Sequence, residues 1–246
     1  MNPMKICVII PAYNEAATIG SVIKAARAYV PDILVINDGS TDKTEEQSRA
    51  NGAVVLTFRK NQGKGEGLKS GFDYAVKNNY DAVITMDGDG QHSPGDILNI
   101  IESAAPPAAG VVVGNRMAAP KGMPPVRFVT NLFMSFIISA VCRQNIPDSQ
   151  CGFRLIKCGV LRNICILSSR YEIESEILIK ASRLGFKIIS APIKSVYEGQ
   201  SSFINPVLDT WRFFSMLFKV LLFESRDAIR KREKCPGRKA VSREGD

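Results

Sequence analysis

The sequence lacks several features that mark common protein classes. Its six cysteines include no C-x-x-C pair, which argues against a zinc site and a disulfide framework; they stand at positions 7, 142, 151, 158, 165 and 235. The spacing G-x-x-x-x-G-K-[ST] is absent, so a P-loop nucleotide hydrolase is not expected. No secretory hydrophobic region is visible where residues 1–5 lead into a short strand pattern. These absences favour a cytoplasmic protein with reduced thiols.

Acidic residues are fewer than basic ones. The chain has 24 Asp and Glu against 32 Lys and Arg, which gives a net charge of +8. Such a surplus favours partners that carry negative charge, such as nucleic acid, anionic lipid or phosphorylated small molecules. The basic segment at 225–246 has few large apolar residues, so we expect a disordered tail. It also lacks interleaved aromatic residues, so nucleic acid is not an expected partner.

Strand and helix patterns alternate through the first half of the chain. Short apolar runs at 6–10, 33–36, 54–58, 82–86 and 111–113 predict strands, and helical patterns at 15–29, 40–50, 65–77 and from about Pro94 lie between them. This order predicts an α/β fold with a mostly parallel sheet flanked by helices. We expect one such domain over residues 1–204, an amphipathic helix over 205–224 and the basic tail.

Polar motifs follow three of the predicted strands directly. They lie at 11–15, 37–40 and 87–91, after the first, second and fourth strands. Ligands of parallel sheets bind beyond the carboxyl ends of the strands. The motifs are therefore expected to share one site at one edge of the sheet.

The third of these motifs has the composition of a metal site. In extended chain Asp87, Asp89 and Gln91 project to the same side. Three oxygen ligands suit Mg²⁺ or Mn²⁺, which leave positions for water and substrate phosphate. A polar turn is the alternative, because Asp-Gly pairs are frequent in turns.

The second half predicts two long helices and a further strand. A helix is predicted at 126–143, with a polar stripe along an otherwise apolar surface. Its apolar stretch is too short and too interrupted for a confident membrane span. A second helix at 171–184 precedes a strand at 187–193. The segment 205–223 is rich in aromatic residues but is interrupted by Arg212 and Lys219. Its length favours an interfacial helix over a spanning one. Packing on the domain's own core or on a second subunit is the alternative.

Four motifs in order resemble a known family. They are Val8-Ile9-Ile10-Pro11-Ala12-Tyr13-Asn14-Glu15, Ile36-Asn37-Asp38-Gly39-Ser40-Thr41-Asp42, Asn61-Gln62-Gly63-Lys64-Gly65 and Asp87-Gly88-Asp89-Gly90-Gln91-His92. Together they resemble glycosyltransferase family 2, and within it the dolichol-phosphate mannose synthase-like branch, over about residues 5–223. The resemblance implies a GT-A-type, Rossmann-like fold and an inverting, metal-dependent glycosyltransferase. The expected donor is a nucleotide sugar and the expected acceptor a polyprenyl phosphate, dolichyl or undecaprenyl, on the cytoplasmic face of a membrane.

The resemblance also implies roles for residues of the donor side. The nucleotide would contact Pro11, Tyr13, Glu15, Asp38, Lys64 and Asp87, and the divalent ion, Mg²⁺ or Mn²⁺, would be held by Asp87, Asp89 and Gln91. Asp38 would accept a base N–H, and Lys64 would face phosphate. Helix capping is the alternative for Glu15 and Asp38, and a flexible glycine-rich turn is the alternative for the Lys64 loop.

The acceptor side is predicted from residues 148–154, which resemble the family's Ser- or Thr-Gly-Phe-Arg segment. Cys151 stands in place of the usual small hydroxyl residue. Arg154 is expected to clamp a phosphate, with Arg127 and Asn131 as further acceptor contacts, and a surface salt bridge is the alternative for either arginine. The predicted catalytic residues are Asp89, Arg154 and Asp148. A phosphate acceptor, with a second pKa of about 6, needs no base; otherwise the base would be Asp148 or one of Glu172, Glu174 and Glu176.

Three other functions are considered. A family 2 enzyme acting on a saccharide or soluble acceptor would differ in having no membrane association. A sugar-phosphate nucleotidyltransferase would be expected to open with a glycine-rich, Arg-bearing loop, which residues 5–20 lack. A non-catalytic nucleotide-sugar-binding protein would bind donor without turning it over.

Overall fold

The structure, a computed structural model, describes residues 4–120, 122–194 and 206–223. The predicted basic tail at 225–246 and Cys235 lie outside these residues. Cys7, Cys142, Cys151 and Cys158 are buried free thiols. The expectation of reduced thiols is confirmed for these four and is wrong for Cys165, which is disulfide-bonded.

Within the described residues, seven strands form one sheet in the order β3-β2-β1-β4-β6-β5-β7. The strands β1 (Ile6–Ala12), β2 (Ile33–Asn37), β3 (Val54–Thr57) and β4 (Ala82–Thr85) are mutually parallel where they pair, and β5 (Ala109–Asn115) pairs in parallel with β7 (Lys187–Pro192). Of these described strands, β6 (Arg154–Lys157) alone runs antiparallel to its neighbours, β4 and β5. The predicted mostly parallel α/β sheet is therefore confirmed.

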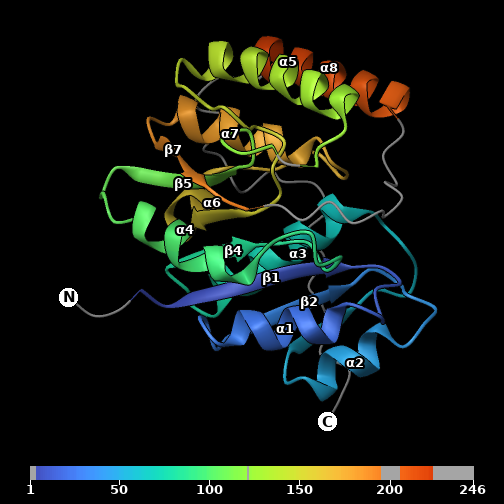
Figure 1. Ribbon diagram of the computed structural model, residues 1–246. Helices are drawn as coiled ribbons and strands as arrows, with labels where there is room; N and C mark the ends of the chain where they lie inside the picture. The colour runs from blue at the N-terminus through green and yellow to red at the C-terminus, as the bar shows by residue number, and fades with distance from the viewer. Residues whose placement is uncertain (1–3, 121, 195–205, 224–246) are drawn as a thin grey trace.

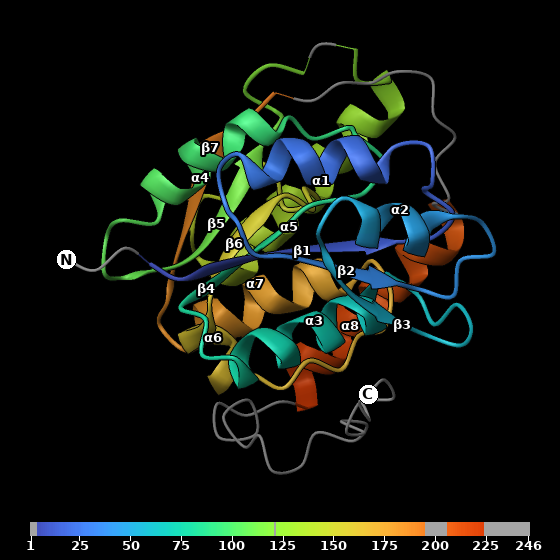
Figure 2. The same ribbon diagram turned by 90° about the horizontal axis from the view of Figure 1, so that it is seen from below.

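Helices cover both faces of the sheet (Figure 2). On one face lie α1 (Ile19–Arg27) and α4 (Ile97–Ser103), which follows the short helix η1 (Pro94–Asp96); on the other lie α3 (Lys64–Lys77), α6 (Cys158–Asn163) and α7 (Ile173–Arg183). The short helix α2 (Thr44–Ala50) packs against α1, β2 and β3. Because both faces are covered, the central strands are apolar throughout, and Val8, Ile9 and Ile10 of β1 are completely buried.

Two differences from the predicted elements have local causes. The first two helices begin later than predicted, at Ile19 and Thr44, because the preceding residues form loops that bond to each other. Strand β6 and helix α6 were not predicted. Half of β6 is basic, with Arg154 and Lys157 at its ends, so it shows no apolar run, and it is buried by pairing with β4 and β5.

Two long helices lie on the side of the molecule away from α1 and α2 (Figure 1). They are α5 (Pro125–Cys142) and α8 (Pro206–Phe223), and both contact α7. The predicted helix at 205–223 is thus confirmed as α8. By length and composition α5 alone, among the described residues, could cross a membrane; its mean hydropathy is 1.6 and 28% of it is buried.

Both helices expose apolar side chains. On α8, one face packs inward through Phe213, Met216, Leu217 and Val220, while Trp211, Phe214, Phe218 and Leu221 are exposed. On α5, the exposed apolar residues are Val126, Val129, Leu132, Phe133 and Phe136. An interfacial role for α8 stays a prediction, and the sequence did not predict the exposed apolar face of α5.

Candidate active site

The loops that follow β1, β2 and β4 are bonded to one another. The Asn14 amide N–H donates to Ser40 Oγ at 3.0 Å, and the Thr41 N–H donates to Asn14 Oδ1 at 2.9 Å. Thr18 Oγ1 donates to the Gly88 carbonyl at 2.8 Å, which joins the first loop to the metal motif. The expectation that the polar motifs share one edge of the sheet is confirmed.

Asp38 shapes the loop that precedes α3. Its carboxylate accepts hydrogen bonds from the N–H groups of Gln62 at 2.7 Å and Gly63 at 2.8 Å, and burial raises its pKa. Asp38 therefore does not cap the helix that follows it in sequence; its partners lie at the start of α3, whose N-cap is Gly63. A carboxylate has about four acceptor positions. Two backbone bonds leave capacity for the base N–H that the sequence predicted, and that contact stays a prediction.

Glu15 lies near the carboxylates of the metal motif. Thr18 Oγ1 donates to its Oε2 at 3.2 Å. Burial raises the pKa of Glu15, and the nearby charges of Asp89 and Asp87 raise it further. Tyr13, on the same loop, is exposed, and Pro11 is half-buried. A nucleotide would therefore meet an aromatic side chain and a partly desolvated carboxylate at the end of β1.

The metal motif forms a turn whose side chains all carry oxygen. Asp87 and Asp89 are both half-buried, as is Gln91. The Gln91 N–H donates to Asp89 Oδ1 at 2.9 Å across Gly90, whose φ is 80°. Two carboxylates and an amide fit a hard divalent ion that takes its other ligands from water and phosphate. The described residues hold no group of three His, Cys, Asp or Glu side chains that would complete a site from protein alone.

His92, the only histidine of the sequence, contacts the backbone of the metal motif. Its Nδ1 accepts the Asp87 backbone N–H at 3.3 Å, and its ring stacks on Phe153 with centroids 5.3 Å apart. Burial lowers its pKa, which favours the neutral ring that this acceptor role requires. His92 therefore positions Asp87.

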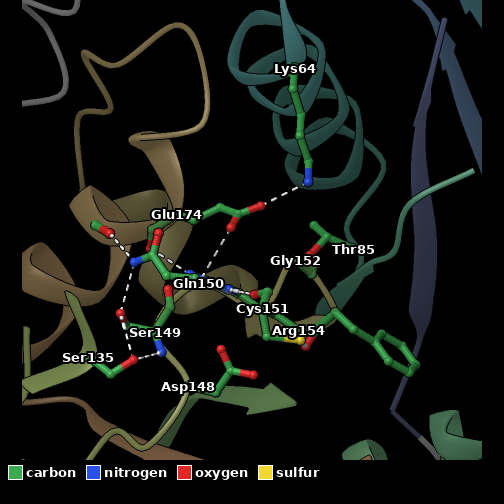
Figure 3. A network of polar contacts seen from close by, with 12 residues as sticks. Lys64, Thr85, Ser135, Asp148, Ser149, Gln150, Cys151, Gly152, Arg154 and Glu174 are labelled. Atoms are coloured by element: carbon green, nitrogen blue, oxygen red, sulfur yellow. Dashed lines mark hydrogen bonds and ion pairs between the residues drawn. The ribbon is translucent and has the colours of Figure 1, made fainter. Parts of the chain in front are cut away.

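Lys64 contacts two carboxylates, and its ion pair with Glu174 is drawn in Figure 3. Its Nζ lies 2.6 Å from Asp87 Oδ1 and 2.9 Å from Glu174 Oε1. Although burial opposes ionisation, the Lys64 ammonium lowers the pKa of Asp87 to about 2. A Cβ on Gly152 would lie 2.9 Å from Lys64 Nζ and 3.0 Å from Asp87 Oδ2, so a side chain at position 152 would have to displace these groups. Lys64 is therefore an ordered cation at the metal motif, and the flexible-turn alternative is wrong.

The structure corrects the role expected of Arg154. Its side chain is 2% exposed, and its guanidinium donates to the carbonyls of Cys151, Ser149 and Glu174. All of these partners belong to the protein, so the guanidinium holds the 149–152 loop against α7 (Figure 3). Arg154 is thus a structural residue and presents no fork to an acceptor phosphate.

Asp148 is likewise occupied. Its carboxylate is fully buried and receives Arg116 Nε at 2.7 Å and Nη2 at 2.8 Å. A carboxylate in a bidentate ion pair with arginine is a weak base, so it is poorly suited to take a proton from an acceptor. The expectation that Asp148 is catalytic is therefore corrected: its carboxylate holds the Arg116 guanidinium in place.

The sequence patterns did not point to Arg116. It follows β5 directly and lies close enough to Asp87 and His92 to influence the pKa of both. Its position after a predicted strand, like that of the three motifs, was the signal that could have identified it. Arg116 brings a second fixed positive charge to the site.

Helix α5 places an unsatisfied polar group inside the molecule. Asn131 is 7% exposed, and its Nδ2 has no hydrogen-bond partner among the described residues. One turn later, Ser135 Oγ accepts the Ser149 N–H at 2.8 Å and fixes α5 to the loop before β6. Buried donors without partners are rare in proteins. The Asn131 amide is therefore available to a ligand, while Arg127, one turn earlier, is half-buried.

Comparison with known proteins places these features in a family. The model of glycosyl transferase family 2 matches residues 7–165. A UDP-N-acetylglucosamine–dolichyl-phosphate N-acetylglucosaminyltransferase from Methanococcus voltae is 33% identical over 219 residues, covering 80% of this chain and 87% of that protein. An undecaprenyl-phosphate mannosyltransferase from Micrococcus luteus is 28% identical over 206 residues, covering 78% and 84%.

A solved structure shares the fold. Glucosyl-3-phosphoglycerate synthase from Mycobacterium tuberculosis, in complex with Mn²⁺, UDP and phosphoglyceric acid, is similar with a TM-score of 0.70 at 20% identity. The similarity covers 90% of this chain and 80% of that one. At this identity the comparison supports the GT-A-type architecture of the chain.

Proposed function

Because the chain belongs to glycosyltransferase family 2, we propose that it transfers a sugar from a nucleotide-sugar donor to a polyprenyl phosphate at a membrane surface. The two relatives described above are named for transfer to dolichyl and undecaprenyl phosphate. The observation that carries the proposal is the position of the metal motif. Asp87 and Asp89 stand at the sheet edge with Lys64 and Arg116, while α5 exposes an apolar face.

On the donor side, each group has a task that follows from its position. Tyr13 and Asp38 face the base, and Lys64 faces the diphosphate. Asp87, Asp89 and Gln91 would hold Mg²⁺ or Mn²⁺, which supplies charge neutralisation for the leaving nucleoside diphosphate. The chain's own residues hold the donor still and direct its anomeric carbon toward the acceptor.

On the acceptor side, the site offers cations and an amide. Asn131 can donate to an acceptor phosphate, and Arg127 can add a charge-assisted hydrogen bond. The best sequence candidate for a general base, Asp148, is committed to Arg116. A phosphate acceptor is already largely ionised at neutral pH, so it attacks without needing that base.

The proposed membrane surface is the outer face of α5 and α8. The two helices lie on one side of the molecule (Figure 1), and each of them exposes apolar residues. Acceptor candidates Arg127 and Asn131 belong to α5 itself, so a lipid-bound phosphate would approach the site from this side. Peripheral association of this kind suits helices with one apolar face.

The test begins with donor binding. The purified protein is titrated by calorimetry with UDP-, GDP- and dTDP-sugars in Mn²⁺ and then in chelator. We expect one donor to bind with metal and to lose most of its affinity in chelator. Undiminished binding in chelator would contradict the metal assignment.

The second stage measures transfer. The donor that binds is incubated with polyprenyl phosphate in vesicles or with soluble saccharides. Product on the lipid supports the proposal, whereas product only on a soluble acceptor would replace the lipid by that acceptor. The Asp89→Ala variant should lose activity and keep its melting temperature, and binding without any turnover would favour a non-catalytic binding protein.

A further inference from the structure

We propose that Glu174 is a positioning residue for Lys64. In the metal-free protein, Glu174 holds the Lys64 ammonium beside Asp87. When a divalent ion replaces the ammonium at Asp87, Glu174 keeps the ammonium at the diphosphate. The proposal rests on the proposed function, because it assigns a role within the same donor site. It adds a residue from α7 to a site otherwise built from the loops after β1, β2 and β4, from Lys64 of α3 and from Arg116 after β5.

The contacts of Glu174 make it a rigid anchor. The residue is 8% exposed, and its carbonyl accepts a hydrogen bond from Arg154 Nη1. Its Oε2 lies 3.6 Å from Arg154 Nη2, while Oε1 receives Lys64 at 2.9 Å. Arg154 is itself held by two further carbonyls. The Glu174 carboxylate is therefore fixed on one side and presents one oxygen to Lys64.

Lys64 needs such an anchor. It is the first residue of α3, and lysine has a flexible four-carbon stem that loses side-chain entropy when it is held in one place. Lys64 also spans two carboxylates from different elements, Asp87 after β4 and Glu174 on α7. A lysine held in advance at the diphosphate spares the donor that ordering cost on binding.

Lys64 and a divalent ion compete for the same oxygen. Lys64 Nζ lies 2.6 Å from Asp87 Oδ1, and a cation bound to that oxygen would repel the ammonium. Glu174 provides the second carboxylate on which the displaced ammonium remains. Because Gly152 has no side chain, the space beside the three groups stays open to the ammonium. Metal binding is thus coupled to a short movement of Lys64 toward the donor's phosphates.

A double-mutant cycle on binding tests the proposal without turnover. Glu174→Gln, Lys64→Met and the double variant are titrated with UDP and GDP, and with uridine and guanosine, in Mn²⁺ and in chelator. We expect Glu174→Gln to weaken binding of the preferred diphosphate roughly tenfold and to leave the nucleoside affinity unchanged. In the Lys64→Met background, Glu174→Gln should cause no further loss, since a residue that acts through another shows coupling in the cycle.

Titration with Mn²⁺ alone provides an independent readout. Lys64→Met should bind Mn²⁺ more tightly than the unaltered protein, because Asp87 and Glu174 lose their internal counter-ion. Glu66→Gln is the matched control, because it breaks a Glu–Lys pair with Lys69 on the same helix, at 2.5 Å. It should change neither the affinity for Mn²⁺ nor the affinity for the diphosphate. If Glu174→Gln does not fold, Glu174→Asp withdraws the carboxylate by one methylene and keeps its charge.

Three results would overturn the proposal: additive losses in the cycle, an equal loss of nucleoside and diphosphate affinity, or unchanged Mn²⁺ affinity in Lys64→Met. The failure of the proposed function is distinguishable from these. It would show as absence of sugar transfer by the unaltered protein, whereas the cycle concerns binding of the diphosphate alone.

Discussion

Glu15, at the end of β1, illustrates how a single residue can lower stability and serve binding. Glu15 is partly buried, and the charges of Asp87 and Asp89 raise its pKa. An acid whose pKa is raised by folding opposes the folded state at neutral pH, where it must be ionised. The hydrogen bond from Thr18 offsets part of that cost, and a bound cation or a donor N–H would offset more, which is the expected pattern for residues kept for function.

Glu15→Gln should therefore stabilise the protein in the absence of ligands. We expect the melting temperature in chelator at pH 7 to rise by about 1–3 °C, because the charge repulsion among the carboxylates falls. Nucleotide-sugar affinity should fall in the same variant. A lower melting temperature would show that Glu15 makes a stabilising contact, and calorimetry with thermal unfolding measures both quantities.

At the scale of an element, α7 supports the donor site through a buried ion pair. Glu176 and Lys180 are both completely buried and lie 2.5 Å apart. Glu176 accepts the N–H groups of Leu167 and Ser168, and Lys180 donates to the Cys165 carbonyl. The loop they hold packs directly on Gly65 of α3 through Ser169. One helix thus fixes the loop behind Lys64.

Lys180→Met should destabilise the protein strongly, since it leaves the Glu176 carboxylate buried without its partner. The expected loss is about 3–5 kcal/mol in the free energy of unfolding, measured by urea titration. Arg49→Met provides the control, because it breaks the same i,i+4 pairing with Glu45 on the exposed helix α2. The control should lose less than about 1 kcal/mol. An equal loss of unfolding free energy in the two variants would contradict the claim that burial makes the Glu176–Lys180 pair costly to break.

At the scale of the whole molecule, the apolar faces of α5 and α8, together with the metal motif, indicate how the protein would lie on a membrane surface. Phe136 is 72% exposed and Phe133 is 55% exposed, both on α5, while Trp211 on α8 is 71% exposed. Large aromatic side chains on the surface of two helices on one side favour attachment to a lipid surface. The acceptor would then reach the site without leaving the membrane.

Replacing Phe133 and Phe136 together by Glu should remove vesicle association and leave the melting temperature within about 2 °C, since exposed positions contribute little packing. Donor binding should be unchanged, because both side chains are exposed on α5 and neither belongs to the proposed donor site. Leu98→Glu on α4, which also replaces an exposed apolar residue, should keep full vesicle association. Flotation with anionic vesicles measures the effect. Association that persists in the double variant would place the contact on α8 alone or on another surface.

The sequence by itself determined the order of elements and the place of the donor motifs. Parallel strands joined by helices bring their carboxyl ends to one edge, so motifs that follow β1, β2 and β4 must meet. The oxygen-rich turn at 87–91 and the amphipathic pattern of α8 are properties of short segments, and short segments can be recognised without the fold.

Only the tertiary structure decided which charged groups face a ligand. Arg154 and Asp148 have the composition of an active site, yet their partners Glu174 and Arg116 come from positions 20 and 32 residues away in the chain. Burial of a charge depends on what packs around it, and local sequence does not contain those neighbours. The same holds for Lys64, since its position between Asp87 and Glu174 exists only after α3, β4 and α7 have come together.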